Sequence, residues 1–130
     1  MAKIAIIDDD PDIVEANTLL LESNGFNICS AGTVDEAIVL VNTEQPDLII
    51  LDVMMQEPDD GFYLANRFRR NGIQTPIIML TSVSKAIGFH FGASEMVPIQ
   101  EFLEKPVPPA VLLEKVNYHL AQVKRSSNAG

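Results

Sequence analysis

The chain has 130 residues, a length typical of one domain, and 47% of them are hydrophobic, which excludes a disordered or fibrous protein. Eighteen acidic residues against nine basic ones give a net charge of −9, and no basic run offers a surface for nucleic acid or an anionic membrane. The single cysteine, Cys29, excludes an intramolecular disulfide, and no apolar stretch has the length of a membrane span. We therefore expect a cytoplasmic protein.

Short apolar runs alternate with longer amphipathic segments along the chain. Three runs are strongly apolar and stop at polar residues, namely residues 4–7, 48–51 and 77–80. Residues 26–31 and 102–103 are weaker candidates of the same kind. Apolar runs this short are typical of strands that are buried on both faces, as in a parallel sheet.

Helical periodicity fills most of the intervals between these runs. It predicts helices over residues 11–23, 34–43, 62–70 and 109–123. Pro11 suits a first helical turn, and Thr33 with Glu36 three residues later forms a capping box. The alternation of strands and helices predicts a three-layer α/β fold with a parallel sheet.

The segment from Ser84 to Gln100 breaks this alternation. Gly88, Gly92 and Pro98 disfavour a continuous helix, and the apolar residues between them have no clean helical period. We expect at most a short helix near residues 83–91, followed by an irregular loop that packs on the sheet.

Polar side chains follow four of the predicted strands, and the carboxyl ends of parallel strands meet at one edge of a sheet, where ligands bind. These residues are Asp8, Asp9 and Asp10 after the first strand, Asp52 after the third, Thr81 after the fourth and Lys105 after the fifth. Each has an ordinary structural role when taken alone, and Asp10 before Pro11 suits a helix N-cap. Their joint occurrence at four strand ends favours a functional site.

The residue types in this set indicate phosphoryl transfer. Clustered carboxylates repel one another unless a cation lies among them, and oxygen ligands of this kind suit Mg²⁺. A lysine and a hydroxyl group can neutralise and hydrogen-bond phosphoryl oxygens. A central carboxylate can then attack phosphorus and become an aspartyl phosphate.

The ordered set of motifs resembles the receiver domain of bacterial two-component response regulators. The matching stretches are residues 4–11 (IAIIDDDP), 48–55 (LIILDVMM), 60–61 (DG), 76–82 (PIIMLTS) and 102–106 (FLEKP). The resemblance implies a flavodoxin-like fold over residues 1–123, with a five-stranded parallel sheet in the order 2-1-3-4-5, helices on both faces and an atypical fourth helix. Residues 124–130 are expected to form a polar C-terminal tail.

The resemblance also implies a role for each matching position. Asp52 matches the phosphoacceptor. Asp8, Asp9 and Asp52, together with the backbone carbonyl of Met54, match the Mg²⁺ ligands. The loop after Asp52 departs from the family pattern, because position 56 is Gln where a proline is common and residues 56–59 make the loop one residue longer.

Three further positions match the parts of the family that sense the phosphoryl group. Thr81 matches the hydroxyl that turns toward it, and Lys105 matches the lysine that pairs with it, with a cis peptide bond to Pro106. Phe102 matches an aromatic residue that switches together with Thr81. The surface formed by the fourth and fifth strands and the helices after them would then change on phosphorylation.

The function expected from this resemblance is a signalling switch, phosphorylated by a histidine kinase or a phosphotransfer protein, and not a turnover enzyme. The resemblance also allows a homodimer on phosphorylation, and names no output partner. A competing hypothesis is a haloacid-dehalogenase-like phosphatase that uses Asp8, since that class also has an aspartate at the end of its first strand. A third is a receiver-like domain that no longer takes phosphate and acts only as an interaction surface.

Overall fold

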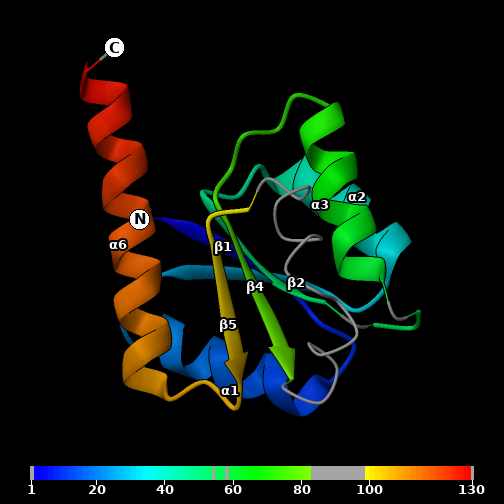
Figure 1. The fold of residues 1–130 in the computed structure, drawn as a ribbon. Coiled ribbons are helices and arrows are strands. Elements are labelled where there is room, and N and C mark those ends of the chain that lie inside the picture. Colours follow the sequence, from blue (N-terminus) through cyan, green and yellow to red (C-terminus); the bar gives the residue numbers. More distant parts are fainter. Residues whose placement is uncertain (1, 54, 58, 83–98, 130) are drawn as a thin grey trace.

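The computed structural model of the protein describes residues 2–53, 55–57, 59–82 and 99–129. Strands and helices alternate along the first 82 residues, as the periodicity predicted (Figure 1). The elements are β1 (Lys3–Ile7), α1 (Pro11–Glu22), β2 (Asn27–Ala31), α2 (Val34–Glu44), β3 (Leu48–Asp52), α3 (Asp60–Arg70), β4 (Ile77–Ser82), β5 (Glu101–Lys105) and α6 (Pro109–Ala129).

The five strands form one parallel sheet in the order β2-β1-β3-β4-β5. Helices α1 and α6 cover one face of the sheet, and α2 and α3 cover the other (Figure 1). The predicted strand order and the three-layer α/β architecture are therefore confirmed.

Two apolar clusters, one on each face of the sheet, form the core. Side chains of β1 alternate between them, because successive strand residues point to opposite faces: Ala5 and Ile7 pack toward α2 and α3, and Ile4 and Ile6 toward α1 and α6. The central strand β3 is buried along its whole length. This two-sided burial explains why its sequence is a continuous apolar run.

Polar side chains begin the first two helices at the predicted residues. Asp10 caps α1 by accepting a hydrogen bond from the Asp12 N–H at 2.9 Å. Thr33 caps α2 by accepting from the Glu36 N–H at 3.1 Å. The Glu36 carboxylate accepts a hydrogen bond from the Gly32 N–H. In the predicted capping box this bond would come from the N–H of the cap residue Thr33, so the observed donor lies one residue earlier in the chain.

Two helix boundaries differ from the sequence-based prediction by more than one residue. Helix α3 begins at Asp60, and α6 continues to Ala129, so the expectation that the last helix ends at residue 123 is wrong. The residues beyond 123 carry no apolar period, and of them Lys124, Arg125 and Ala129 favour helix, whereas Ser126, Ser127 and Asn128 favour it less. The division into a domain and a polar tail stays a prediction.

The atypical fourth helix was predicted in a part of the chain that the structure mostly leaves undescribed. Of residues 84–100, only Ile99 and Gln100 are described, so the expected short helix and loop lie outside the described residues. Ile99 packs against the cluster on the side of α2 and α3.

None of the helices in the described part of the chain combines the length and apolar character that crossing a membrane requires.

Candidate functional site

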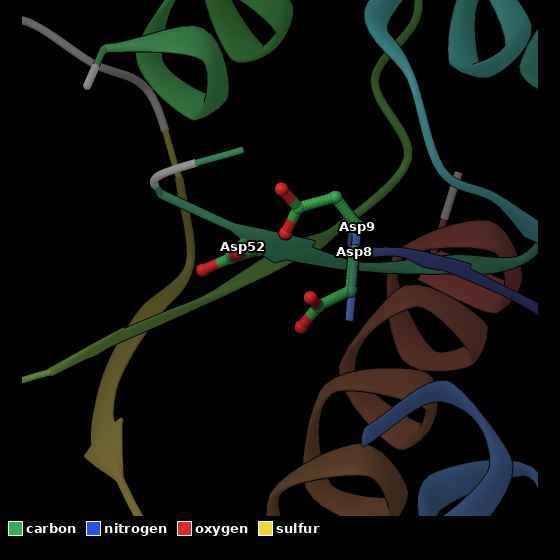
Figure 2. Close-up of side chains that lie close together, drawn as sticks. All are labelled: Asp8, Asp9 and Asp52. Carbon is green, nitrogen blue, oxygen red and sulfur yellow. The ribbon is translucent and has the colours of Figure 1, made fainter. Parts of the chain in front are cut away.

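Three carboxylates meet at the carboxyl edge of the sheet. Ile7 pairs with Leu51 in the β1–β3 register, so the residues that follow them, Asp8 and Asp52, come side by side. Asp9 points into the same space (Figure 2), and one oxygen from each of the three groups lies within 4.8 Å of the others. Asp8 and Asp52 are buried, whereas Asp9 is exposed.

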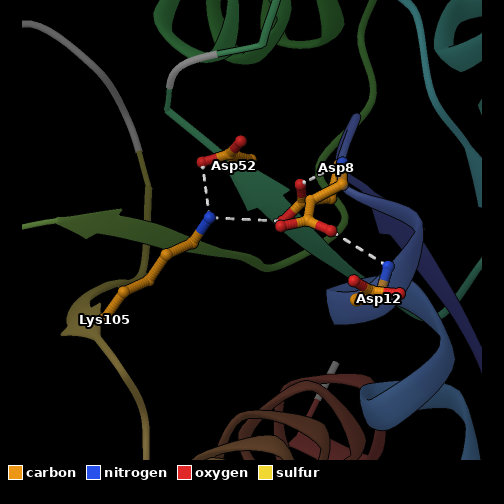
Figure 3. A network of polar contacts seen from close by, with 5 residues as sticks. Asp8, Asp12, Asp52 and Lys105 are labelled. Atoms are coloured by element: carbon orange, nitrogen blue, oxygen red, sulfur yellow. Dashed lines mark hydrogen bonds and ion pairs between the residues drawn. The ribbon is translucent and has the colours of Figure 1, made fainter.

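Lys105 reaches this cluster from the end of β5. Its Nζ lies 3.0 Å from Asp52 Oδ1 and 3.3 Å from Asp8 Oδ2 (Figure 3). Burial disfavours the charged ammonium, but the hydrogen bond to Asp52 and the negative charge of Asp8 outweigh it, so the pKa of Lys105 lies above its ordinary value of 10.5. The protonated Lys105 therefore contributes stability below its ordinary pKa as long as its carboxylate partners are ionised, and this contribution is lost as the pH rises through the raised pKa.

The surroundings of Asp8 fix the direction of its carboxylate. Its Oδ1 accepts a hydrogen bond from the Asp10 N–H at 2.9 Å, while Oδ2 faces Lys105. Asp10 in turn caps α1, so the first turn of that helix and the Asp8 side chain are held together (Figure 3). The start of α1 thus supports one wall of the site.

The donor set of the cluster suits a hard divalent cation. All its atoms are carboxylate oxygens, and the ammonium of Lys105 lies against two of the three carboxylates. Carboxylate oxygens are ligands of the kind that Mg²⁺ binds. The acidic triad Asp8, Asp9 and Asp52 is consistent with a Mg²⁺ site.

The loop between β3 and α3 is tied to the backbone of the site. The Gly61 N–H donates to the Val53 carbonyl at 2.8 Å, and the buried Asp60 carboxylate accepts from the Glu57 N–H at 2.9 Å. A Cβ atom on Gly61 would collide with the Asp52 carbonyl oxygen and lie 2.7 Å from Val53 Cα. The sequence analysis assigned Asp60 and Gly61 to a family motif but did not predict this close approach of Gly61 to the backbone, because the approach depends on tertiary packing.

The predicted switch residues Thr81 and Phe102 lie in β4 and β5, respectively. Leu80 pairs with Asp52, so Thr81 follows one step further toward the edge, and its side chain is half-buried. Phe102 of β5 is also half-buried, and its ring centroid lies 6.1 Å from that of Phe62 in α3.

Two further expectations from the resemblance have different outcomes. The Lys105–Pro106 peptide bond is cis, as predicted. The backbone carbonyl of Met54, predicted as a metal ligand, lies outside the described residues and stays a prediction. Of the predicted site residues, Asp8, Asp9, Asp52 and Lys105 lie together at the carboxyl edge of the sheet.

Comparison with known proteins identifies the family. The family model described as the response regulator receiver domain matches residues 4–117. The chain belongs to this receiver-domain family. Its membership supports two-component signalling and argues against the dehalogenase-like phosphatase that uses Asp8.

Curated relatives of this receiver domain are longer proteins. The chain is 32% identical over 129 residues to the alkaline phosphatase synthesis transcriptional regulatory protein PhoP of Bacillus subtilis (strain 168). The matched region covers 96% of this chain and 49% of that protein. It is 35% identical over 130 residues to the transcriptional regulatory protein YvrH of the same organism, covering 96% and 52%. The chain thus spans about half the length of the curated relatives it matches.

Solved receiver domains share the fold over nearly their whole length. The BeF3-activated N-terminal receiver domain of RstA from Klebsiella pneumoniae is 31% identical with a TM-score of 0.79, covering 91% of this chain and 97% of that chain. The receiver domain of the Francisella response regulator 1452 is 28% identical with a TM-score of 0.83, covering 95% and 99%.

Replacing Gly61 by alanine should disturb the site through the backbone. The added Cβ meets backbone atoms of Asp52 and Val53 that cannot rotate away, so α3 must shift, and we expect a loss of about 1–3 kcal/mol of stability. Chemical denaturation measures this loss. Gly32→Ala is the matched control, because its Cβ meets only ordinary contacts at 3.8 Å or more. Equal stability of the two variants would contradict the close approach at Gly61.

Mutual repulsion in the acidic triad predicts the behaviour of Asp9→Asn. Removing one of the three charges should raise the thermal midpoint of the metal-free protein. In the wild-type protein, Mg²⁺ at about 100 times its dissociation constant should add roughly 2.7 kcal/mol of stability, and in Asp9→Asn much less. Thermal melts with Mg²⁺ and with chelator test both parts. The exposed Asp35→Asn is the charge-matched control, and an unchanged Mg²⁺ effect in Asp9→Asn would refute the ligand assignment.

Proposed function

We propose that this receiver domain is a phosphoacceptor switch in which Asp52 takes a phosphoryl group from a histidine kinase or a phosphotransfer protein. The observation that carries the proposal is the position of the Asp52 carboxylate. It is buried at the carboxyl edge of the sheet, beside Asp8 and Asp9 and 3.0 Å from the ammonium of Lys105, in a chain of the receiver-domain family.

The proposed reaction is a direct transfer between two side chains. A carboxylate oxygen of Asp52 attacks the phosphorus atom of a phosphohistidine, forming an O–P bond while the N–P bond breaks. The electron pair of the broken bond stays on the imidazole nitrogen, which takes up a proton. With a small donor such as acetyl phosphate, acetate leaves instead. The product remains on the protein, so the domain acts as a switch and not as a turnover enzyme.

Charge neutralisation is the main catalytic requirement of this step. Asp8, Asp9 and Asp52, with the backbone carbonyl of Met54, would hold Mg²⁺, which when bound offsets negative charge on the phosphoryl oxygens. Lys105 already lies between two carboxylates, so it can exchange one of them for a phosphoryl oxygen with little movement. Thr81, at the end of the neighbouring strand, would donate its hydroxyl to another phosphoryl oxygen.

The response to phosphorylation would spread from these groups to β4, β5 and the helices that follow them. Thr81 and Phe102 are the proposed switch pair, and homodimer formation through the changed surface is part of the same proposal. We place the domain in the cytoplasm, where it meets its kinase. The chain spans about half the length of its curated relatives, and we propose no output for it.

A phosphodonor protein must reach Asp52 at the carboxyl edge of the sheet. An apolar cavity opens beside Lys105 there, between α1 and the start of α6, and its lining includes Ile13, Leu80, Val107 and Leu112. We propose that side chains of the kinase or phosphotransfer protein occupy this cavity while its phosphohistidine faces Asp52.

Mass spectrometry after incubation with acetyl phosphate and Mg²⁺ tests the proposed phosphoacceptor. We expect one acid-labile phosphoryl group on the wild-type protein and none on Asp52→Asn, because the amide is not a competent nucleophile. Asp10→Asn is the matched control, since it removes the same charge nearby while asparagine keeps the helix cap. Stoichiometric labelling of Asp52→Asn, or a wild-type protein that takes no label, would refute the proposal.

A further inference from the structure

The register of β5 receives little support from buried side chains. None of its five residues is fully buried, in contrast to β3, and within the described part of the chain its strand partner is β4 alone. Its two apolar residues, Phe102 and Leu103, are adjacent and pack on opposite faces of the sheet. Each face of β5 therefore carries a single apolar side chain and no repeat at every second residue. Register is weakly specified in strands of this kind. A slip of two residues would move Lys105 by roughly 7 Å, out of the site.

Gln100, directly before β5, binds both backbone groups of one residue in β4. Its N–H donates to the Ile77 carbonyl at 3.0 Å, and its side-chain Oε1 accepts from the Ile77 N–H at 2.7 Å. Only one alignment of the two strands allows both bonds. They place Glu101 opposite Ile78, and the ladder continues from there to Lys105 opposite Ser82.

Arg69, in the last turn of α3, completes this arrangement. Its Nη2 donates to Gln100 Oε1 at 3.1 Å, and its Nη1 donates to the carbonyls of Ile73 and Thr75 at 2.9 Å each. One guanidinium therefore joins the α3–β4 loop to the residue directly before β5. Its planar, forked donors suit such a fixed set of acceptors.

We propose that Arg69 and Gln100 form a register clamp that positions β5 and so keeps Lys105 directed at Asp8 and Asp52. The functional part of this inference rests on the proposed phosphoryl transfer. Phosphorylation of Asp52 would change the ion pairs of Lys105, which also hold the strand. The clamp lies at the opposite end of β5 and uses none of those charges, so it keeps the register while they change.

A second contact holds the same end of β5 on its other face. Glu101 Oε1 lies 3.1 Å from His119 Nε2 and 3.7 Å from Lys115 Nζ, both in α6. This contact fixes the strand to a helix and not to β4, so it does not determine the register of the ladder. The test therefore alters Gln100 and leaves Glu101 unchanged.

Amide hydrogen exchange in the absence of Mg²⁺ tests the clamp independently of phosphorylation. Gln100→Met keeps the side-chain length but removes the acceptor, and it should speed exchange across Glu101–Lys105 roughly fivefold, as expected for the loss of one or two partly exposed hydrogen bonds. Gln100→Glu keeps an acceptor for Arg69 and Ile77 and should restore the wild-type rates. Gln74→Met, at an exposed glutamine of the α3–β4 loop, is the matched control. Unchanged exchange in Gln100→Met would overturn the clamp.

The rate of labelling by acetyl phosphate and Mg²⁺ tests whether the clamp acts through Lys105. Gln100→Met should slow labelling several-fold in the wild-type background, at a temperature where all variants are folded, and Gln100→Glu should not. In a Lys105→Met background, Gln100→Met should cause no further slowing. The same fold loss in both backgrounds would overturn the positioning role. If the wild-type protein takes no label, the proposed function fails, and the exchange rates alone decide whether the clamp exists.

Discussion

Buried negative charge at the carboxyl edge of the sheet constrains every group that surrounds it. Asp8 and Asp52 are buried, and Asp9 adds a third charge close by. Burying carboxylates is costly unless cations and hydrogen bonds compensate them. Lys105 supplies one positive charge and the Asp10 N–H supplies a hydrogen bond. The three carboxylates together are consistent with a Mg²⁺ site at this edge.

The backbone, more than the side chains, brings these charges together. The β1–β3 register sets Asp8 beside Asp52, and the absence of a side chain at Gly61 lets α3 approach the carbonyl of Asp52. The cap formed by Asp10 joins the site to α1. Asp52 thus lies at the end of a buried strand, and Asp8 and Asp9 lie in the short loop between β1 and α1, so the backbone holds the carboxylates in place before any ligand binds.

The sequence predicts the parts of this structure that depend on local pattern. The continuous apolar runs of β1, β3 and β4 identify buried strands, and the polar residues at their ends identify the edge that binds ligands. The true end of α6 at Ala129 was not predictable from periodicity, because its last turns lack an apolar face in the sequence. The roles of Gly61 and Gln100 depend on contacts between elements distant in sequence, and neither residue belongs to a periodic pattern.

The two ends of β5 are held by different kinds of interaction. At the carboxyl end, Lys105 binds two carboxylates through charge, and these contacts respond to any change in the charge of the site. At the amino end, the register depends on the hydrogen bond that the Gln100 N–H donates to the Ile77 carbonyl and on the one that Gln100 Oε1 accepts from the Ile77 N–H, with Arg69 donating to the same oxygen from α3. On the proposed function, phosphorylation of Asp52 would rearrange the ion pairs of Lys105, and a strand held by them alone would then lose its register. A fixed amino end would instead confine the change to the surroundings of Lys105, which is what a reversible switch requires.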